Sequence, residues 1–278
     1  MRTQEQSDEP ILYIKAANEI NSPLLKHAKD YNSQCGEDGI IEALINILSL
    51  QAGKFCEFGA WDGIHLSNTR YLAEKLGWSG LYIEGDSLKY DNLVSNYAEN
   101  KKITCVNAFV EISGINSLDN LLASHSAEAS IDILSIDIDG MDFYIWQSLI
   151  SRPAIVIIEF NPSVPNDVVF VQPCNSALNQ GCSLLALITL AQTKGYSLAC
   201  ATNLNAFFVV NELFWKLEIK DNSINSLYKP MQNGRIFHGY DSHIYTIGME
   251  RLLWSQNVTL NHSDLQALPK SQRRVWGR

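Results

Sequence analysis

Apolar residues recur along this chain with two different spacings, and the change from one to the other marks its helices and strands. Short, nearly continuous apolar runs predict buried strands, whereas apolar residues three and four positions apart predict helices. Strands are expected at residues 54–58, 80–84, 103–106, 131–138, 154–160, 196–201 and 206–210. Helices are expected at residues 40–48, 67–76, 88–99, 117–124, 142–149 and 183–194.

The order of these elements predicts the fold class. Continuous apolar strands that alternate with helices are typical of a parallel sheet covered on both faces. Only a few residues separate the last two strands, and parallel neighbours need a longer crossover, so this pair is expected to be an antiparallel hairpin. The sequence therefore predicts an α/β fold with a doubly wound, Rossmann-like sheet of seven strands and a terminal antiparallel hairpin.

The same pattern divides the chain into three regions. Residues 1–32 are polar and mixed, and we expect them to form an N-terminal arm. Residues 33–211 are expected to form the core, and residues 212–278, where the periodicity fades, a C-terminal extension. Within the core, a connection of about twenty residues at 162–181 is long enough to suggest a functional lid, although it could also be a surface loop that covers the end of the sheet.

Composition narrows the class of protein. The chain has 278 residues, of which 46% are hydrophobic and 18% charged, and this balance excludes a disordered chain. Its formal net charge is −9, so the basic face that binds phosphates is missing and no nucleic-acid partner is expected. The six cysteines form no CxxC pair, and we find neither a signal-peptide pattern nor a membrane-spanning run. A cytoplasmic protein is expected.

The first expected strand leads into a glycine-containing turn, EFGAWDG at residues 57–63. In doubly wound sheets, ligands bind beyond the carboxyl ends of the strands, and Gly59 and Gly63 would let the backbone approach a ligand closely. The segment is not the G-x-G-x-x-G fingerprint of dinucleotide-binding proteins, and it could also be no more than a tight turn. We take Glu57 and Gly59 as candidate cofactor contacts.

Two more candidates follow the next strands. Glu84 ends the second strand, where an acidic residue binds ribose hydroxyls in nucleoside-binding α/β proteins. It could instead cap the following helix, a role that Asp86 fits better. Asn107 follows the third strand and could face an adenine ring or belong to a turn.

A series of short segments carries a resemblance to a known family. They are SQCGEDG at residues 33–39, EFGAWDG at 57–63, SNT at 67–69, GWSG at 77–80, IE at 83–84, DILSIDIDGMD at 132–142, IEFN at 158–161, KGYSL at 194–198 and NAFFV at 205–209. Together they resemble the FkbM-type methyltransferases, in particular the branch that opens with S-Q-x-G-E-D-G. The resemblance covers about residues 33–210.

That resemblance implies a class I methyltransferase fold and S-adenosyl-L-methionine (SAM) as the cofactor. It also implies O-methylation, commonly of sugars or natural products. In the family the opening signature lies over the cofactor, which adds Gln34, Asp38 and Asn68 to the candidate cofactor contacts.

Acidic and amide groups gather at the ends of the fourth and fifth strands. Asp137 and Asp139 end the fourth, and Glu159 and Asn161 end the fifth. Such hard oxygen ligands suit Mg²⁺, and the set resembles the Asp, Asp and Asn of metal-dependent O-methyltransferases, where the metal acidifies the acceptor hydroxyl. Those metal-dependent enzymes have an adjacent Asp-Asn pair at this place, where this chain has Glu159-Phe160-Asn161. A metal-free alternative therefore stays open, in which Asp142 caps the next helix and Asp137 supports the cofactor loop.

The methyl-transfer step needs a group that removes a proton from the acceptor. Asp139 is the main candidate for this general base, with Asp137 and His65 as alternatives. A lone loop histidine such as His65 is more often a surface residue. The functional hypothesis is a SAM-dependent O-methyltransferase that acts on a small molecule and could form a homo-oligomer. The alternative is a non-catalytic scaffold of the same fold, with residues 212–278 as its interface.

Overall fold

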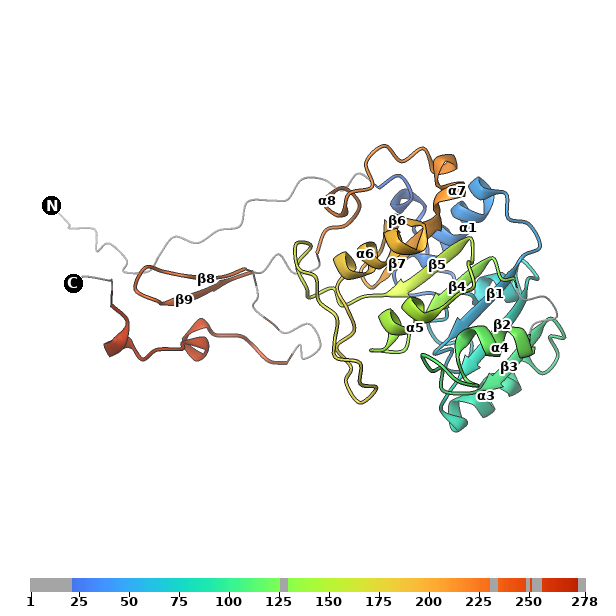
Figure 1. Ribbon diagram of the computed structural model, residues 1–278, viewed down its shortest axis with the longest axis horizontal. Coiled ribbons are helices and arrows are strands. Elements are labelled where there is room, and N and C mark those ends of the chain that lie inside the picture. Colours follow the sequence, from blue (N-terminus) through green and yellow to red (C-terminus); the bar gives the residue numbers. More distant parts are fainter. Residues whose placement is uncertain (1–21, 126–129, 231–234, 249–250, 252–256, 275–278) are drawn as a thin grey trace. The chain divides into compact units, whose positions relative to one another are not determined.

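The computed structural model describes residues 22–125, 130–230, 235–248, 251 and 257–274, and residues 1–21 of the expected N-terminal arm lie outside this part. The chain divides into two compact units. One is Ile20–Lys229, which contains the sheet, and the other contains Pro230–Arg278 together with Met1–Glu19 (Figure 1).

The larger unit is built on a seven-stranded sheet with the strand order β3-β2-β1-β4-β5-β7-β6. The strands are β1 (Lys54–Phe58), β2 (Ser79–Glu84), β3 (Ile103–Asn107), β4 (Ile133–Ile136), β5 (Ile155–Glu159), β6 (Tyr196–Ala201) and β7 (Asn205–Val210). All seven expected strands are present, with ends that differ by a few residues at most.

The strand directions confirm the predicted fold class. β3, β2, β1, β4 and β5 pair in parallel, whereas β7 pairs antiparallel with both β5 and β6. The chain builds the sheet outwards from β1 to β3 on one side and then continues with β4 on the other side of β1. In doubly wound sheets, ligands bind at such a reversal of strand order, which here lies between β1 and β4. This seven-stranded order with one antiparallel strand is the class I methyltransferase fold.

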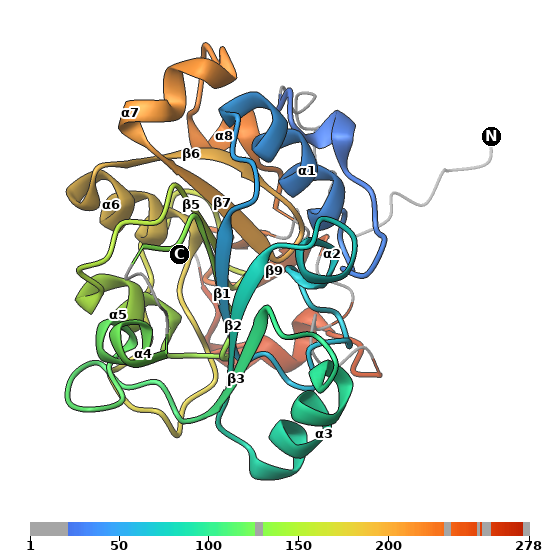
Figure 2. The same ribbon diagram turned by 90° about the vertical axis from the view of Figure 1, so that its right-hand side faces the viewer.

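Helices cover both faces of the sheet (Figure 2). They are α1 (Glu37–Leu48), α2 (Arg70–Glu74), α3 (Ser87–Tyr97), α4 (Leu118–His125), α5 (Asp142–Ser148), α6 (Leu184–Lys194), α7 (Asn211–Phe214) and α8 (Ile224–Leu227). The apolar side chains of α1, α2 and α3 pack in one core cluster, and those of α4, α5 and α6 pack in another on the opposite face. Neighbouring residues of β1 contribute to different clusters, Phe55 to the first and Cys56 to the second, as alternation along a strand requires.

Local sequence explains where several helices begin and end. The Asp86 carboxylate accepts hydrogen bonds from the backbone N–H groups of Leu88 and Lys89 at the start of α3, so Asp86 is the cap, as the sequence favoured. The Ser183 hydroxyl accepts a hydrogen bond from the N–H of Ala186 at the start of α6, and Gly195 ends that helix with φ +78°.

The compact unit is wider than the expected core of residues 33–211. Before it, Leu24 is buried beside the 3₁₀ turn Leu25–His27. After it, Leu217, Leu227 and Tyr228 are buried in the segment that carries α7 and α8. Apolar residues outside the regular pattern therefore belong to this unit on both sides.

The second unit contains a hairpin that the sequence pattern did not predict. Its strands β8 (Arg235–His238) and β9 (Ile244–Ile247) pair antiparallel, and the rings of Phe237 and Tyr245 stack across them with centroids 5.3 Å apart. Two strands of four residues are too short for the periodicity to stand out. Within the described part of the chain, no helix is long and apolar enough to cross a membrane.

Candidate functional site

The loop after β1 turns sharply at the carboxyl edge of the sheet. Gly59 has φ +74°, and a Cβ there would lie 1.7 Å from the carbonyl oxygen of Asp137 at the end of β4. Gly63 has φ +71°, and a Cβ there would lie 2.5 Å from the ring of Tyr97. Both glycines are required, as expected, but the close approach they permit is to atoms of the protein itself.

Glu57 anchors the segment that precedes α2. Its carboxylate is buried and accepts hydrogen bonds from the hydroxyl of Ser67 at 2.7 Å, from the N–H groups of Asn68 and Thr69 at 3.2 Å each, and from the hydroxyl of Thr69. Burial raises the pKa of Glu57, and these hydrogen bonds act in the opposite direction. Its expected direct contact with a cofactor stays a prediction.

Glu84 lies where the loop after β1 meets the end of β2. Its two carboxylate oxygens accept the N–H of Trp61 at 2.7 Å and the N–H of Asp86 at 2.8 Å. Each carboxylate oxygen can accept a second hydrogen bond, so Glu84 keeps acceptor capacity for a hydroxyl pair. The amide of Asn107 donates to the carbonyl oxygens of Glu84 and Gly85, at 2.8 and 3.3 Å, which gives it the turn role that the sequence left open.

The opening signature at residues 33–39 is held together by two buried acids. One oxygen of Asp38 accepts the N–H groups of Tyr31, Asn32 and Ser33 at 2.6–2.8 Å. Glu37 accepts hydrogen bonds from the hydroxyl of Thr202 and the amide of Asn205, at 2.8 and 3.2 Å.

These two acids thus tie the start of α1 to the preceding loop and to the β6–β7 hairpin. Sequence reasoning missed this tie, because Glu37 lies well over a hundred residues from its partners. Of the other candidates from the same signature, Gln34 is exposed, and the buried Asn68 donates to the Ser135 hydroxyl at 3.2 Å.

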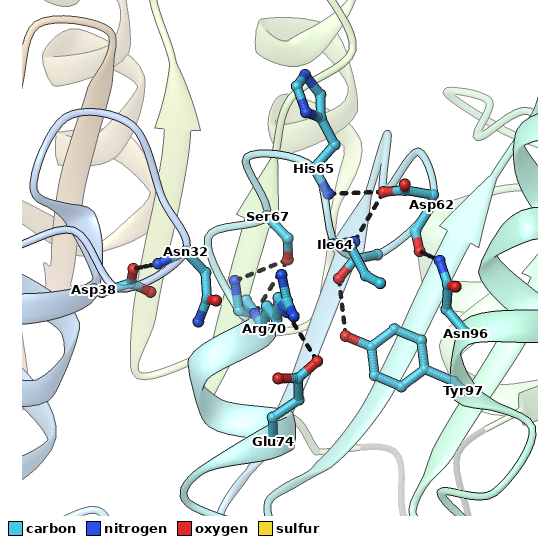
Figure 3. A network of polar contacts seen from close by, with 12 residues as sticks. Asn32, Asp38, Asp62, Ile64, His65, Ser67, Arg70, Glu74, Asn96 and Tyr97 are labelled. Carbon is cyan, nitrogen blue, oxygen red and sulfur yellow. Dashed lines mark hydrogen bonds and ion pairs between the residues drawn. The ribbon is translucent and has the colours of Figure 1, made fainter.

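The rim of the loop carries aromatic and basic side chains. Trp61 is 47% exposed with φ +52°, and the Nζ of Lys89 lies 3.6 Å from the centroid of its ring. The ring of His65 lies 5.5 Å from that of Trp61. Figure 3 shows the imidazole of His65 pointing away from the polar network, whereas its backbone N–H donates to Asp62 at 2.7 Å. His65 is therefore free to meet a ligand or solvent.

Three carboxyl groups converge at the ends of β4 and β5. Asp137, Asp139 and Glu159 each offer an oxygen, and these oxygens lie within 4.8 Å of one another. At this separation the carboxylates of Asp137 and Glu159 would repel each other, and a proton held by either one would reduce that repulsion. Burial, together with the neighbouring carboxylates, raises the pKa of Asp137 to about 8 and that of Glu159 to about 9.

Asp142 orders the loop that carries this cluster. Its carboxylate is buried and accepts the N–H of Ile138 at 3.0 Å and that of Gly140 at 2.8 Å. Asp139 lies between them, exposed and with φ +59°, a left-handed conformation that Asp tolerates better than most residues. The metal-free alternative had Asp142 as the cap of the next helix, and this is not observed, because α5 has no side-chain cap and Asp142 accepts N–H groups of the loop before it.

Asn161 anchors the start of the loop that follows β5. Its side-chain oxygen accepts hydrogen bonds from the N–H and the hydroxyl of Ser163, and its amide donates to the carbonyl oxygen of Gln180 at 3.0 Å. In this structure the Asn161 side chain holds the loop at residues 162–181, and its expected role as a metal ligand stays a prediction.

That loop is built around one buried side chain. Gln172 accepts the N–H groups of Gln180 and Gly181, at 2.8 and 2.9 Å, and donates to the carbonyl oxygen of Asn175 at 3.2 Å. A Cβ on Gly140 would lie 2.5 Å from the carbonyl oxygen of Leu178. The loop thus packs against the end of β4 beside the carboxyl cluster, and nothing in the sequence distinguished Gln172 from the other polar residues of the loop.

Comparison with known proteins identifies no family for this chain. No family model matches the chain, and no curated protein does. Among solved structures, it is similar to the N-terminal domain of EvdMO1 with S-adenosylhomocysteine (SAH) bound, at 12% identity and TM-score 0.44, over 65% of this chain and 82% of that one.

Two further solved structures are similar to the chain. A TehB-like SAM-dependent methyltransferase from Corynebacterium glutamicum is 15% identical, with TM-score 0.41 over 67% of this chain and 92% of that one. A candidate sarcosine dimethylglycine methyltransferase from Galdieria sulphuraria is also 15% identical, with TM-score 0.37 over 56% of this chain and 57% of that one. The chain thus spans a little over half the length of this last neighbour.

Proposed function

We propose that this protein is a SAM-dependent methyltransferase that transfers the methyl group to a hydroxyl of a small molecule. One observation carries the proposal. In a sheet of class I order, the acid that ends β2, Glu84, is joined to the loop after β1 through the N–H of Trp61. In the same structure, the carboxyl groups of Asp137, Asp139 and Glu159 converge at the ends of the neighbouring strands β4 and β5.

The cofactor would lie along the carboxyl edge of β1 and β2. SAM carries no phosphate, and its ribose diol suits the remaining acceptor capacity of Glu84. Its ammonium group suits an acidic edge such as this one, in a chain of net charge −9. Glu57 and Gly59 remain candidate contacts beside Glu84, and the secondary candidates for the same pocket are Gln34, Asp38, Asn68 and Asn107.

The carboxyl cluster would serve the transfer itself. Bound SAM would supply the methyl group: the acceptor oxygen would bond to the methyl carbon as the bond from that carbon to sulfur broke, and SAH would be left. The hydroxyl proton must leave at the same time. The exposed Asp139 is the group that would take it, while the proton held between Asp137 and Glu159 limits the negative charge beside it.

A divalent cation would also fit part of this cluster. Mg²⁺ binds oxygens at about 2.1 Å, so its neighbouring ligand oxygens lie about 3 Å apart, and small side-chain rotations would bring the oxygens of Asp137, Asp139 and Glu159 together from within 4.8 Å. Bound there, the ion would acidify the acceptor hydroxyl and displace the shared proton. The donors that the structure brings together are these three carboxylates, and Asn161 remains a candidate fourth ligand.

The acceptor class rests on sequence resemblance. The FkbM-type signature segments favour a sugar or natural-product hydroxyl, and the loop at residues 162–181 would cover that acceptor. An acceptor screen with radiolabelled SAM, run over sugars and natural products, tests this part of the proposal.

Isothermal titration calorimetry with SAH tests the cofactor. We expect binding by the wild type and about tenfold weaker binding by Glu84→Gln, because hydrogen bonds to a charged group are the stronger ones. Asp86→Asn is the matched control, since it removes a neighbouring charge but keeps the acceptor that caps α3. A folded wild type that binds neither SAM nor SAH would overturn the proposal in favour of a non-catalytic scaffold.

A further inference from the structure

Two side chains in the last turn of α3 donate hydrogen bonds to two successive carbonyl groups of the loop after β1. The amide of Asn96 donates to the carbonyl oxygen of Asp62 at 2.9 Å, and the hydroxyl of Tyr97 donates to that of Gly63 at 2.8 Å. Figure 3 shows both side chains reaching the loop from the helix. The ring of Tyr97 also fills the space that a side chain at position 63 would need.

The remaining polar groups of this turn are also engaged. The N–H of Gly63 donates to the carbonyl oxygen of Ala60 at 2.8 Å. The N–H groups of Ile64 and His65 donate to the carboxylate of Asp62 at 2.9 and 2.7 Å. These hydrogen bonds hold both carbonyls and three N–H groups of the turn. From other elements, α3 holds residues 62 and 63, whereas β2 accepts the N–H groups of Ala60 and Trp61.

A series of buried hydroxyl groups connects these contacts to β1. The hydroxyls of Tyr97 and Tyr82 lie 3.4 Å apart, and those of Tyr82 and Thr69 lie 3.3 Å apart. The Thr69 hydroxyl in turn donates to Glu57. Burial raises the pKa of Tyr97 to about 12, so its hydroxyl keeps its proton and remains a donor across the physiological range.

The same helix also sets the position of the other cofactor element. α3 begins at its cap, Asp86, whose N–H is bound by Glu84. One turn into the helix, Lys89 lies over the ring of Trp61. A single rigid helix therefore contacts the acid that ends β2 at its start and the loop after β1 at its end.

We propose that α3 sets the distance between the two halves of the cofactor site, with Tyr97 and Asn96 as positioning residues that hold the loop after β1 in its binding conformation. This inference rests on the proposed function, because it assigns a role in SAM binding to residues that do not touch the cofactor. Loss of either contact would let the loop relax and weaken binding of SAM and SAH.

The test compares three variants of the full chain by SAH calorimetry and thermal unfolding. Tyr97→Phe removes one hydroxyl, and Asn96→Ala removes an exposed amide whose loss leaves the core intact. Tyr90→Phe is the matched control, because it removes a hydroxyl from the same helix whose partner is the carbonyl oxygen of Cys105. We expect the dissociation constant for SAH to rise about fivefold in Tyr97→Phe and in Asn96→Ala, the usual effect of one hydrogen bond, and to stay unchanged in Tyr90→Phe.

Measuring both the SAH dissociation constant and the melting temperature separates a positioning role from a structural one. A merely structural role for Tyr97 would lower the melting temperature and leave SAH affinity, measured well below that temperature, as it is in the wild type. Wild-type affinity in both loop variants, or an equal loss in Tyr90→Phe, would overturn the inference alone. Absence of SAH binding by the wild type would instead overturn the proposed function, and the inference with it.

Discussion

Replacing Asp137 by asparagine tests the shared proton of the carboxyl cluster. In the folded protein, burial and neighbouring carboxylates raise the pKa of Asp137 from 3.8 to about 8. The folded state therefore keeps a proton that the unfolded state releases above about pH 4. Stability should fall as the pH rises from about 4 towards 8, because the folded state binds more protons than the unfolded state in this window. The asparagine side chain would keep the shape, hold a hydrogen bond to Glu159 and need no proton.

The size of the effect follows from the linkage. One proton taken up on folding changes the free energy of unfolding by 1.36 kcal/mol per pH unit, so the ceiling between pH 5 and pH 7 is about 2.7 kcal/mol. Asp137 is partly accessible to solvent, which screens its interactions, and we expect about half of that ceiling. Asp137→Asn should therefore gain about 1.4 kcal/mol in free energy of unfolding relative to the wild type over these two pH units.

Urea unfolding followed by circular dichroism at pH 5, 6 and 7 measures this gain. EDTA in every sample keeps metal ions from neutralising the carboxylates. Asp91→Asn, at an exposed position of α3, is the control that removes one charge elsewhere. A difference in stability between the wild type and Asp137→Asn that stays constant with pH would refute the shared proton.

Three other predictions concern activity and the glycine turn. Asp139→Asn should lower turnover about a hundredfold, the scale of a lost general base, with SAH affinity unchanged; near-normal turnover would move the role to His65 or Glu159. EDTA should suppress methyl transfer and Mg²⁺ restore it if the cluster holds a metal, and full activity in EDTA would exclude that ion. Gly59→Ala should lower the melting temperature by many degrees, since its Cβ would overlap the carbonyl oxygen of Asp137; an unchanged melting temperature would contradict this packing.

The fold could be predicted because its signals are local. Each strand of the sheet is an apolar run, and the short link between β6 and β7 leaves a hairpin as the only connection. The sequence pattern did not predict the hairpin β8–β9 or the helices α7 and α8, because elements of four residues are too short to show a hydrophobic period. The same limit placed the core boundary at residue 211, before the buried Leu217 and Leu227.

The candidate site could be predicted in position more than in role. The sequence correctly placed four acids at the carboxyl ends of the strands, because parallel strands present these ends on one side of the sheet. They are Glu57, Glu84, Asp137 and Glu159. Whether such an acid faces a ligand or binds the backbone depends on partners distant in sequence. Glu57 has Ser67 and Thr69 to bind, and no pattern within the strand indicates this.

The contact between Gly59 and the carbonyl of Asp137 changes how relatives of this protein should be classified. A glycine required by the spacing of two strands would persist in a descendant that had lost its cofactor, and so would Glu57, whose partners are part of the chain. A diagnosis of lost activity should instead look to Asp139, which is exposed and has no such structural duty. Sequences that keep the turn but vary at that aspartate are the ones to examine as pseudoenzymes.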